Sequence, residues 1–394
     1  MNFSQRAANI KPSATLALAN KAKEMKAQGI DVINLSVGEP DFKTPAHIKQ
    51  AAIEAIQAGK ADAYTAATGI LPLREAIATY TNNDYQTNFT AKNVAVTVGG
   101  KLSLYALAQV LFEARDEVLI PLPYWVSYGE QVKLAEAKPV FVAPALGNDK
   151  VSVVELEAKR TDKTKACIIN SPQNPAGLIY SREELEAIGN WAVEHEIILI
   201  ADDMYSKLVY NGNQFVSLLN LSDAIRKQTI LVNGLSKAYA MTGWRVGYTV
   251  ASEEVIQKLA AFLGHATSNL AAVSQYAALA ALTGDQACVE EMRQAYEERL
   301  NTIYPQLVAL PGFKFTKPQG AFYMFPNIRE TLELTGFKSA DDFAAALLEQ
   351  AHVAVVVGSA FGMPDCIRIS YATDLASLQE AVKRIKKFIE EYRH

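Results

Sequence analysis

The sequence is poor in cysteine, in long apolar runs and in excess charge of either sign. Its three cysteines, Cys167, Cys288 and Cys366, lie far apart and form no CxxC pair, which argues against a disulfide framework. No apolar run reaches the roughly 18 residues that a membrane-spanning helix needs. The N-terminal segment breaks its apolar stretch with polar residues too early for a secretory signal. We therefore expect a cytoplasmic protein that has no membrane partner.

The charges of the chain nearly cancel. Lys and Arg number 38 against 42 Asp and Glu, so the formal net charge is −4. A nucleic-acid-binding protein usually carries a basic excess or a basic stripe, so we expect no nucleic-acid partner. Half of the residues are hydrophobic, which together with the small net charge excludes a disordered chain. With 394 residues, the chain is long enough for two or three domains.

Several common catalytic motifs are also missing. The sequence contains no GxGxxG, HExxH or GxSxG motif, which argues against a dinucleotide-dependent dehydrogenase and against the usual zinc and serine hydrolases. The Gly99-Gly100-Lys101 segment lacks the earlier glycine and the following Ser or Thr of a P-loop. The five histidines are scattered without metal-ligand spacing, so we expect no metal site.

Short apolar segments alternate with helical patterns over the first three quarters of the chain. The strands are predicted at residues 93–98, 117–121, 166–170, 197–201 and 229–233. Helices are predicted at residues 13–29, with Ser13 as the cap, and at 45–58, 102–112 and 181–196. This alternation is typical of βαβ units, so we expect an α/β fold with a mainly parallel sheet between helices.

The pattern changes after about residue 290. Helices are predicted at residues 290–299, at 339–350 and at the C-terminus, and short strands at 353–357 and 367–370. We therefore expect a large domain at residues 41–290 and a smaller α+β domain at 291–394. The N-terminal segment, residues 1–40, is expected to form part of the small domain.

Polar and aromatic side chains follow the predicted strands. In chain order they are Gly99-Gly100-Lys101, Tyr124-Trp125, Asn174, Asp202 with Tyr205, and Ser236-Lys237. Ligands of parallel α/β sheets bind beyond the carboxyl ends of the strands. The set offers an anion cradle, an aromatic plate, an amide, a carboxylate, a phenol and an amine. Pyridoxal phosphate needs such groups around its phosphate, ring and aldehyde.

At these residues the chain resembles the class I aminotransferases of pyridoxal-phosphate fold type I, and most of all the bacterial aspartate aminotransferases. The resemblance runs nearly from end to end. Its motifs are Lys11-Pro-Ser-Ala-Thr-Leu16, Val37-Gly-Glu-Pro-Asp-Phe42, Tyr64 ahead of Gly69-Ile-Leu-Pro-Leu-Arg74, Pro123-Tyr-Trp-Val-Ser-Tyr128, Asn170-Ser-Pro-Gln-Asn-Pro175, Asp202 with Tyr205, Ser236-Lys237, Met241-Thr-Gly-Trp-Arg245-Val-Gly247, Gly320-Ala-Phe-Tyr323 and Ile367-Arg-Ile-Ser-Tyr-Ala372.

The resemblance implies pyridoxal 5'-phosphate as the cofactor. It implies Lys237 as the lysine of the Schiff base and Asp202 as the carboxylate that keeps the pyridine nitrogen protonated. Tyr205 and Asn174 are implied as hydrogen-bond partners of the phenolate oxygen, and Trp125 as the aromatic side chain over the ring. The other implied cofactor-binding residues are Gly99, Gly100, Lys101, Ser236, Arg245 and Tyr64. Because Tyr64 is expected to reach the neighbouring subunit, a homodimer with shared sites is implied.

The same resemblance implies the substrate contacts. Arg368, whose forked guanidinium suits a carboxylate, would hold the α-carboxylate of an amino acid, and Gly38 would let the backbone approach that group. Trp125 and Asn174 are expected beside the substrate. Lys101, with the segment 13–15, is associated in this subgroup with the distal carboxylate of aspartate or glutamate. The expected reaction is a ping-pong amino transfer between an L-amino acid and a 2-oxo acid.

Alternatives remain open from the sequence. Lys101 also fits a solvated lysine at a helix start, Tyr64 a core tyrosine, and Asp203 competes with Asp202 for its role. Ala176, Gly234 and Asn269 depart from the usual family residues, which leaves one phosphate contact and the acceptor preference open. The alternative functions are an aromatic or other amino-acid aminotransferase, a β-lyase of the same fold, a nucleotide-dependent dehydrogenase and a non-enzymatic binding protein.

Overall fold

The computed structural model describes residues 2–11 and 14–393, and within them the side chains outside residues 14–19. Ser13, the expected helix cap and part of the expected distal-carboxylate segment, lies outside the described residues. Among the described residues no helix is long and apolar enough to cross a membrane. In the same residues no three His, Cys, Asp or Glu side chains cluster as candidate metal ligands.

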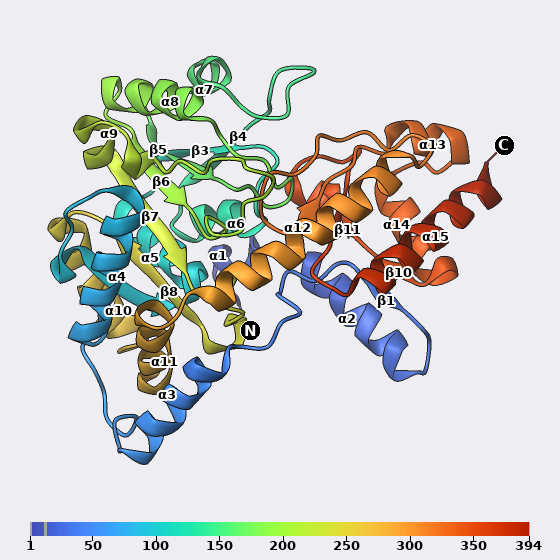
Figure 1. The fold of residues 1–394 in the computed structure, drawn as a ribbon. Helices are drawn as coiled ribbons and strands as arrows, with labels where there is room; N and C mark the ends of the chain where they lie inside the picture. Colours follow the sequence, from blue (N-terminus) through green and yellow to red (C-terminus); the bar gives the residue numbers. More distant parts are fainter. Residues whose placement is uncertain (1, 12–13, 394) are drawn as a thin grey trace.

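A seven-stranded sheet forms the centre of the larger part of the molecule (Figure 1). Its strands, in spatial order, are β2 (Val94–Val98), β8 (Val246–Val250), β7 (Thr229–Gly234), β6 (Ile198–Asp202), β5 (Thr164–Asn170), β3 (Glu117–Pro121) and β4 (Lys138–Val142). All neighbouring pairs are parallel except those of β8, which runs antiparallel to β2 and β7. The prediction of a mainly parallel sheet is confirmed.

Helices cover both faces of this sheet (Figure 1). The helices of this part are α3 (Ala46–Gln57), α4 (Leu71–Tyr85), α5 (Gly99–Leu111), α6 (Ser127–Leu134), α7 (Val153–Lys159), α8 (Arg182–Glu194), α9 (Asp223–Gln228), α10 (Glu253–Ala266) and α11 (Ala272–Thr283), and α3 packs on α11. Successive strand residues enter different cores: Ile168 and Ile200 belong to one buried cluster, and Cys167 and Leu199 to another. Strands buried on both faces consist of nearly continuous apolar residues, which is why the sequence revealed them.

The second part of the molecule contains shorter strands and several helices. Its elements are α2 (Ala14–Ala27), β1 (Ile33–Asn34), β9 (Tyr323–Met324), α13 (Arg329–Thr335), α14 (Ala340–Ala351), β10 (Val353–Ala354), β11 (Val356–Val357), β12 (Ile367–Ser370) and α15 (Leu375–Tyr392). The short helix α1 (Gln5–Ala8) precedes Lys11, whose N–H donates to Glu130 of α6 in the larger part. Strand β1 pairs with β10, so the N-terminal segment shares a small sheet with C-terminal residues. Strands β11, β12 and β9 form a separate three-stranded sheet.

The long helix α12 (Ala287–Val308) runs between the two parts (Figure 1). The expected helix at residues 290–299 is therefore too short, and the expected domain limit at residue 290 falls inside α12. The single strand expected at residues 353–357 is wrong, because β10 and β11 pair in different sheets. A run of five apolar residues gives no sign of this division.

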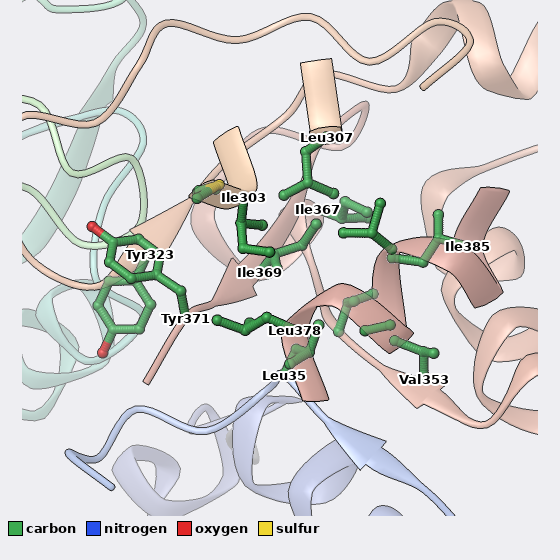
Figure 2. Close-up of a cluster of buried hydrophobic side chains, with 14 of the residues drawn as sticks. Leu35, Ile303, Leu307, Tyr323, Val353, Ile367, Ile369, Tyr371, Leu378 and Ile385 are labelled. Carbon is green, nitrogen blue, oxygen red and sulfur yellow. The ribbon is translucent and has the colours of Figure 1, made fainter. Parts of the chain in front are cut away.

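A buried apolar cluster holds the second part together (Figure 2). It joins α12 through Ile303 and Leu307, β12 through Ile367 and Ile369, and α15 through its apolar stripe. The stripe lies at positions 378, 381, 382, 385, 388 and 389, the spacing of one helix face. Asp374 caps α15 by accepting a hydrogen bond from the Ser377 N–H at 2.8 Å. Each buried Leu or Ile side chain contributes about 1.5–3 kcal/mol, so this packing fixes the position of β12.

Candidate active site

The predicted site residues lie at the carboxyl ends of strands in the large sheet. Asp202 is the last residue of β6 and pairs in register with Asn170 of β5 and Val232 of β7. Lys237 follows three residues after the end of β7. Gly99 opens α5 directly after β2. Because parallel strands end at the same edge, these residues gather there, as the sequence predicted.

Asp202 is a buried carboxylate held by neutral donors. The Tyr128 hydroxyl donates to its Oδ2 at 2.5 Å, and the Met204 N–H donates to its Oδ1 at 3.2 Å. Burial raises the pKa of Asp202, while these donors and the charge of Lys237 oppose the rise. Among the described residues Asp202 forms no ion pair. Trp125 meets the Tyr128 ring edge-on at a centroid distance of 5.4 Å, which places an aromatic side chain beside this carboxylate.

Lys237 brings a weakly basic amine to the same place. Its Nζ donates a hydrogen bond to the Gly38 carbonyl and lies 5.8 Å from the centroid of the Tyr205 ring. Burial lowers the pKa of Lys237 to about 8, with further lowering by the charges of Arg368 and Arg245. A larger fraction of this amine is therefore neutral near neutral pH than for an ordinary lysine. A neutral amine can act as a nucleophile or a base.

Arg368 is a buried cation that lacks a carboxylate partner among the described residues. Only 3% of its surface is exposed. Its Nη2 donates to the Ser36 carbonyl at 2.8 Å and its Nη1 to Asn174 Oδ1 at 3.1 Å. Its Nε has no hydrogen-bond partner in the described chain. Burial lowers the pKa of Arg368. A buried charge of this kind is costly unless an anion comes to it.

Glycine residues let the start of α5 pack directly on β8. A Cβ on Gly247 would overlap the backbone of Gly99 and Gly100. Gly99 has a positive φ of +76°, and a Cβ there would lie 2.5 Å from Arg245 Nη2. Helix α5 also has no side-chain cap, so its first N–H groups and the Arg245 guanidinium face one region. Backbone N–H groups at a helix N-terminus together with a guanidinium form an anion cradle.

The structure explains why position 234 is a glycine, although the family that the sequence resembles often has serine there. A Cβ at Gly234 would lie 2.7 Å from the Val246 carbonyl oxygen and 3.1 Å from the Met204 methyl group. A serine would therefore require β7, β8 or Met204 to move.

Lys101, the third residue of α5, lies beside the predicted site residue Trp125. Its Nζ is 4.9 Å from the centroid of the Trp125 ring, a cation–π contact. Partial burial and the charge of Arg245 lower the pKa of Lys101. Together with Lys11, Glu130 and Arg245 it lines a cavity of about 790 Å³. The side chains of the expected partner segment, residues 13–15, lie outside the described ones.

Tyr64 is the predicted site residue that this chain does not bring to the cluster. Its side chain is 89% exposed. Ser236, in contrast, is buried directly beside Lys237. Tyr205 is buried, but its hydroxyl bonds to the hydroxyl of Tyr323 at 2.7 Å.

Sequence reasoning assigned no role to Tyr128 or Tyr323, although both stood inside quoted motifs. A sequence does not distinguish a tyrosine that only packs in the core from one whose hydroxyl forms a hydrogen bond with a site residue.

Comparisons with known proteins agree with this geometry. Residues 30–385 match the family model described as aminotransferase class I and II. The chain is 50% identical over 388 residues to an aspartate aminotransferase of Bacillus sp. (strain YM-2), which covers 98% of this chain and 99% of that protein. It is 49% identical over 390 residues to an asparagine–oxo-acid transaminase of Streptococcus mutans, with 99% of each chain covered.

A solved structure shows the same fold. The aspartate aminotransferase from Rhizobium meliloti superposes with a TM-score of 0.95 at 38% sequence identity, covering 99% of each chain. The predicted fold, an α/β architecture of pyridoxal-phosphate fold type I, is confirmed. The family match spans well over half of the residues. The chain therefore belongs to the class I and II aminotransferases and is a transaminase.

Proposed function

We propose that this transaminase uses pyridoxal 5'-phosphate to move the amino group between an L-amino acid, foremost aspartate or glutamate, and a 2-oxo acid. The observation that carries the proposal is Arg368. It is a buried guanidinium without a carboxylate partner in the described chain, and its Nε is free of hydrogen bonds. The α-carboxylate common to all amino and 2-oxo acids supplies the missing charge and acceptors.

The residues present fit the cofactor. Asp202 is a buried carboxylate without a cationic contact in the described chain, which suits a protonated ring nitrogen. The cradle of Gly99, Gly100 and Arg245 leaves room that a Cβ would fill and suits a phosphate. We propose Ser236 as a further phosphate ligand. When bound, pyridoxal phosphate supplies an electron sink for the bond that breaks at the amino-acid Cα.

The chain's own groups then have defined tasks. Arg368 would hold the α-carboxylate and, with Asn174 fixed against it at 3.1 Å, set the direction of the Cα–H bond. Lys237, whose pKa burial lowers to about 8, would take the proton from Cα and return it. Asn174 and Tyr205 would donate hydrogen bonds to the phenolate oxygen of the cofactor. Trp125 would cover the ring, and Gly38 would line the carboxylate site.

The preference for a diacid is supported by Lys101. An ammonium 4.9 Å from the Trp125 ring centroid can pair with a distal carboxylate. Relatives with about half of their residues identical are named for aspartate and for asparagine. An ammonium can also donate to the oxygen of a distal amide. Asparagine therefore belongs in the substrate panel beside aspartate and glutamate.

The assembly is part of the same proposal. We propose a cytoplasmic homodimer in which Tyr64 of one subunit reaches the phosphate bound by the other. The large exposed fraction of Tyr64 supports this. We also propose residues 41–290 as the cofactor-binding domain, with residues 1–40 and 291–394 forming the small domain beside it.

The experiment that tests the proposal identifies the lysine to which the cofactor binds covalently. Purified protein, loaded with pyridoxal phosphate, should absorb visible light, and borohydride should fix the cofactor covalently to Lys237. A Lys237→Ala variant should show no label, whereas Lys207→Ala, which removes a lysine outside the site, should be labelled normally. Aspartate or glutamate should bleach the chromophore and yield the 2-oxo acid. A label on another lysine, or a release of ammonia in place of amino transfer, would refute the proposal.

A further inference from the structure

Tyr323 lies among the proposed site residues, although no role has been given to it. It is 1% exposed. Its hydroxyl is 2.7 Å from the Tyr205 hydroxyl, and the centre of its ring is 4.4 Å from the guanidinium carbon of Arg368. A Cβ on Gly38 would lie 3.1 Å from the same hydroxyl. Tyr323 therefore contacts both the proposed carboxylate clamp and the proposed partner of the phenolate oxygen.

The contact joins the two parts of the molecule. Tyr323 belongs to β9 and pairs with Ser370 of β12, the strand that carries Arg368. Tyr205 follows β6 of the large sheet. In Figure 2 the hydroxyl of Tyr323 lies at one end of the apolar cluster and points away from its aliphatic side chains. The buried ring lies against the Arg368 guanidinium, and its hydroxyl reaches Tyr205.

The number of protons decides the direction of the bond. A tyrosine hydroxyl carries one proton and two lone pairs. On the proposed function, Tyr205 gives its proton to the phenolate oxygen of the cofactor, so the bond between the two tyrosines must use the proton of Tyr323. A donor that itself accepts a hydrogen bond is polarised and donates more strongly.

We propose that Tyr323 is a positioning residue that donates its hydroxyl proton to Tyr205 and thereby strengthens the bond from Tyr205 to the cofactor. The inference rests on the proposed function. Arg368 supports it electrostatically, because a cation against the ring makes the phenol a better donor, and its charge lowers the pKa of Tyr323 against the effect of burial. The other charges that face the pair are Glu39 toward Tyr323, and Asp202 and the Lys237 amine toward Tyr205.

The experiment measures the resting holoenzyme without substrate. The pH midpoint of the visible absorbance of bound pyridoxal phosphate reports how well the phenolate oxygen is stabilised. Tyr323→Phe keeps the ring against Arg368 and removes only the hydroxyl. We expect its midpoint to rise by roughly half a pH unit. In the Tyr205→Phe background the same change should produce no further shift, because the route to the cofactor is already broken.

A matched control comes from the same core. Tyr371 is fully buried, and its hydroxyl donates to the Ala321 carbonyl at 3.1 Å and not to Tyr205. Tyr371→Phe should leave the midpoint unchanged. An unshifted midpoint in Tyr323→Phe, or an equal shift in the presence and absence of the Tyr205 hydroxyl, would overturn the inference. A wild type without a chromophore would instead refute the proposed function.

A second substitution guards against a folding defect. 3-Fluorotyrosine at position 323 has nearly the volume of tyrosine and a more acidic hydroxyl, so it is the stronger donor. It should move the midpoint downward, opposite to Tyr323→Phe. An upward shift would contradict the assigned direction of donation.

Discussion

Asp202 and Asp203 are neighbours at the end of β6, yet their carboxylates meet different surroundings. Asp202 accepts hydrogen bonds from the Tyr128 hydroxyl and the Met204 N–H. Asp203 is 3% exposed, and its Oδ2 has no partner in the described part of the chain. Burial raises the pKa of Asp203 to about 7. Of the two candidates left by the sequence, Asp202 is the one with a hydrogen-bond donor on each carboxylate oxygen.

Asp203 should make the stability of the protein depend on pH. Its pKa rises from 3.8 to about 7 on folding, so the folded protein holds an extra proton between these values. The stabilisation is complete below the lower value and is lost as the pH rises through the higher one. We expect Asp203→Asn to be more stable than wild type by roughly 4 kcal/mol at about pH 8 and by roughly 1.5 kcal/mol at about pH 5, because about 1.4 kcal/mol is lost for each pH unit between the two pKa values.

Urea unfolding at both pH values checks this expectation. Asp223→Asn is the control, because the Asp223 side chain is 85% exposed. Parallel pH dependence in Asp203→Asn and wild type would show that Asp203 is not the group responsible.

At the scale of elements, the contact between α5 and β8 depends on glycine. No side chain fits at Gly247 without moving the backbone of Gly99 and Gly100. Gly247→Ala should therefore push the start of α5 from the sheet and destabilise the protein by roughly 2–4 kcal/mol. Because the displaced N–H groups form the proposed phosphate cradle, the affinity for pyridoxal phosphate should fall about tenfold or more.

Gly264 supplies the opposite control. It lies within α10, and a Cβ there would meet nothing within 4 Å. Gly264→Ala should stabilise the protein by about 0.5–1 kcal/mol and leave cofactor affinity unchanged. Thermal unfolding and cofactor titration of both variants check the pair. If Gly247→Ala and wild type bound the cofactor with equal affinity, the contact between α5 and β8 would not shape the proposed phosphate cradle.

The limits of sequence reasoning are clear for particular elements. Strands β5, β6 and β7 were predictable because both of their faces are buried, so their residues are continuously apolar. Strands β4 and β8 were not predicted. β4 lies at the sheet edge, is partly exposed and contains Pro139, and both features weaken a strand pattern.

In the site, too, some features could be predicted from the sequence and others could not. Residues at strand ends, such as Asp202 and Lys237, could be placed together because parallel strands end at one edge. The hydrogen bonds of Tyr128 and Tyr323 could not, because they span 74 and 118 residues and depend on side-chain packing.

For the whole molecule, the stretch of chain from α3 to the start of α4 carries exposed apolar side chains together with Tyr64. Ile53, Ile56 and Leu71 are 47%, 57% and 53% exposed, and Tyr64 is 89% exposed. If Tyr64 completes the partner's site, two inactive variants should complement each other in mixed dimers. Tyr64→Ala and Lys237→Ala, each nearly inactive, should recover about a quarter of wild-type activity when mixed equally and allowed to exchange subunits. One site of each mixed dimer then carries neither substitution.

The control mixes Lys237→Ala with Arg245→Ala. Both residues would serve the site of their own subunit, so every site in every dimer retains a defect and activity should not return. Failure of the first mixture to recover, despite proven subunit exchange, would place Tyr64 outside the shared site.

The unpaired charge of Arg368 also has a consequence for redesign. A primary amine without a carboxylate would fill the proposed site yet leave this buried guanidinium without an anion. Such a compound would be rejected however well its side chain fitted near Lys101. Conversion of this scaffold into a catalyst for plain amines should therefore begin by replacing Arg368 with an apolar residue, and only afterwards enlarge the side-chain pocket.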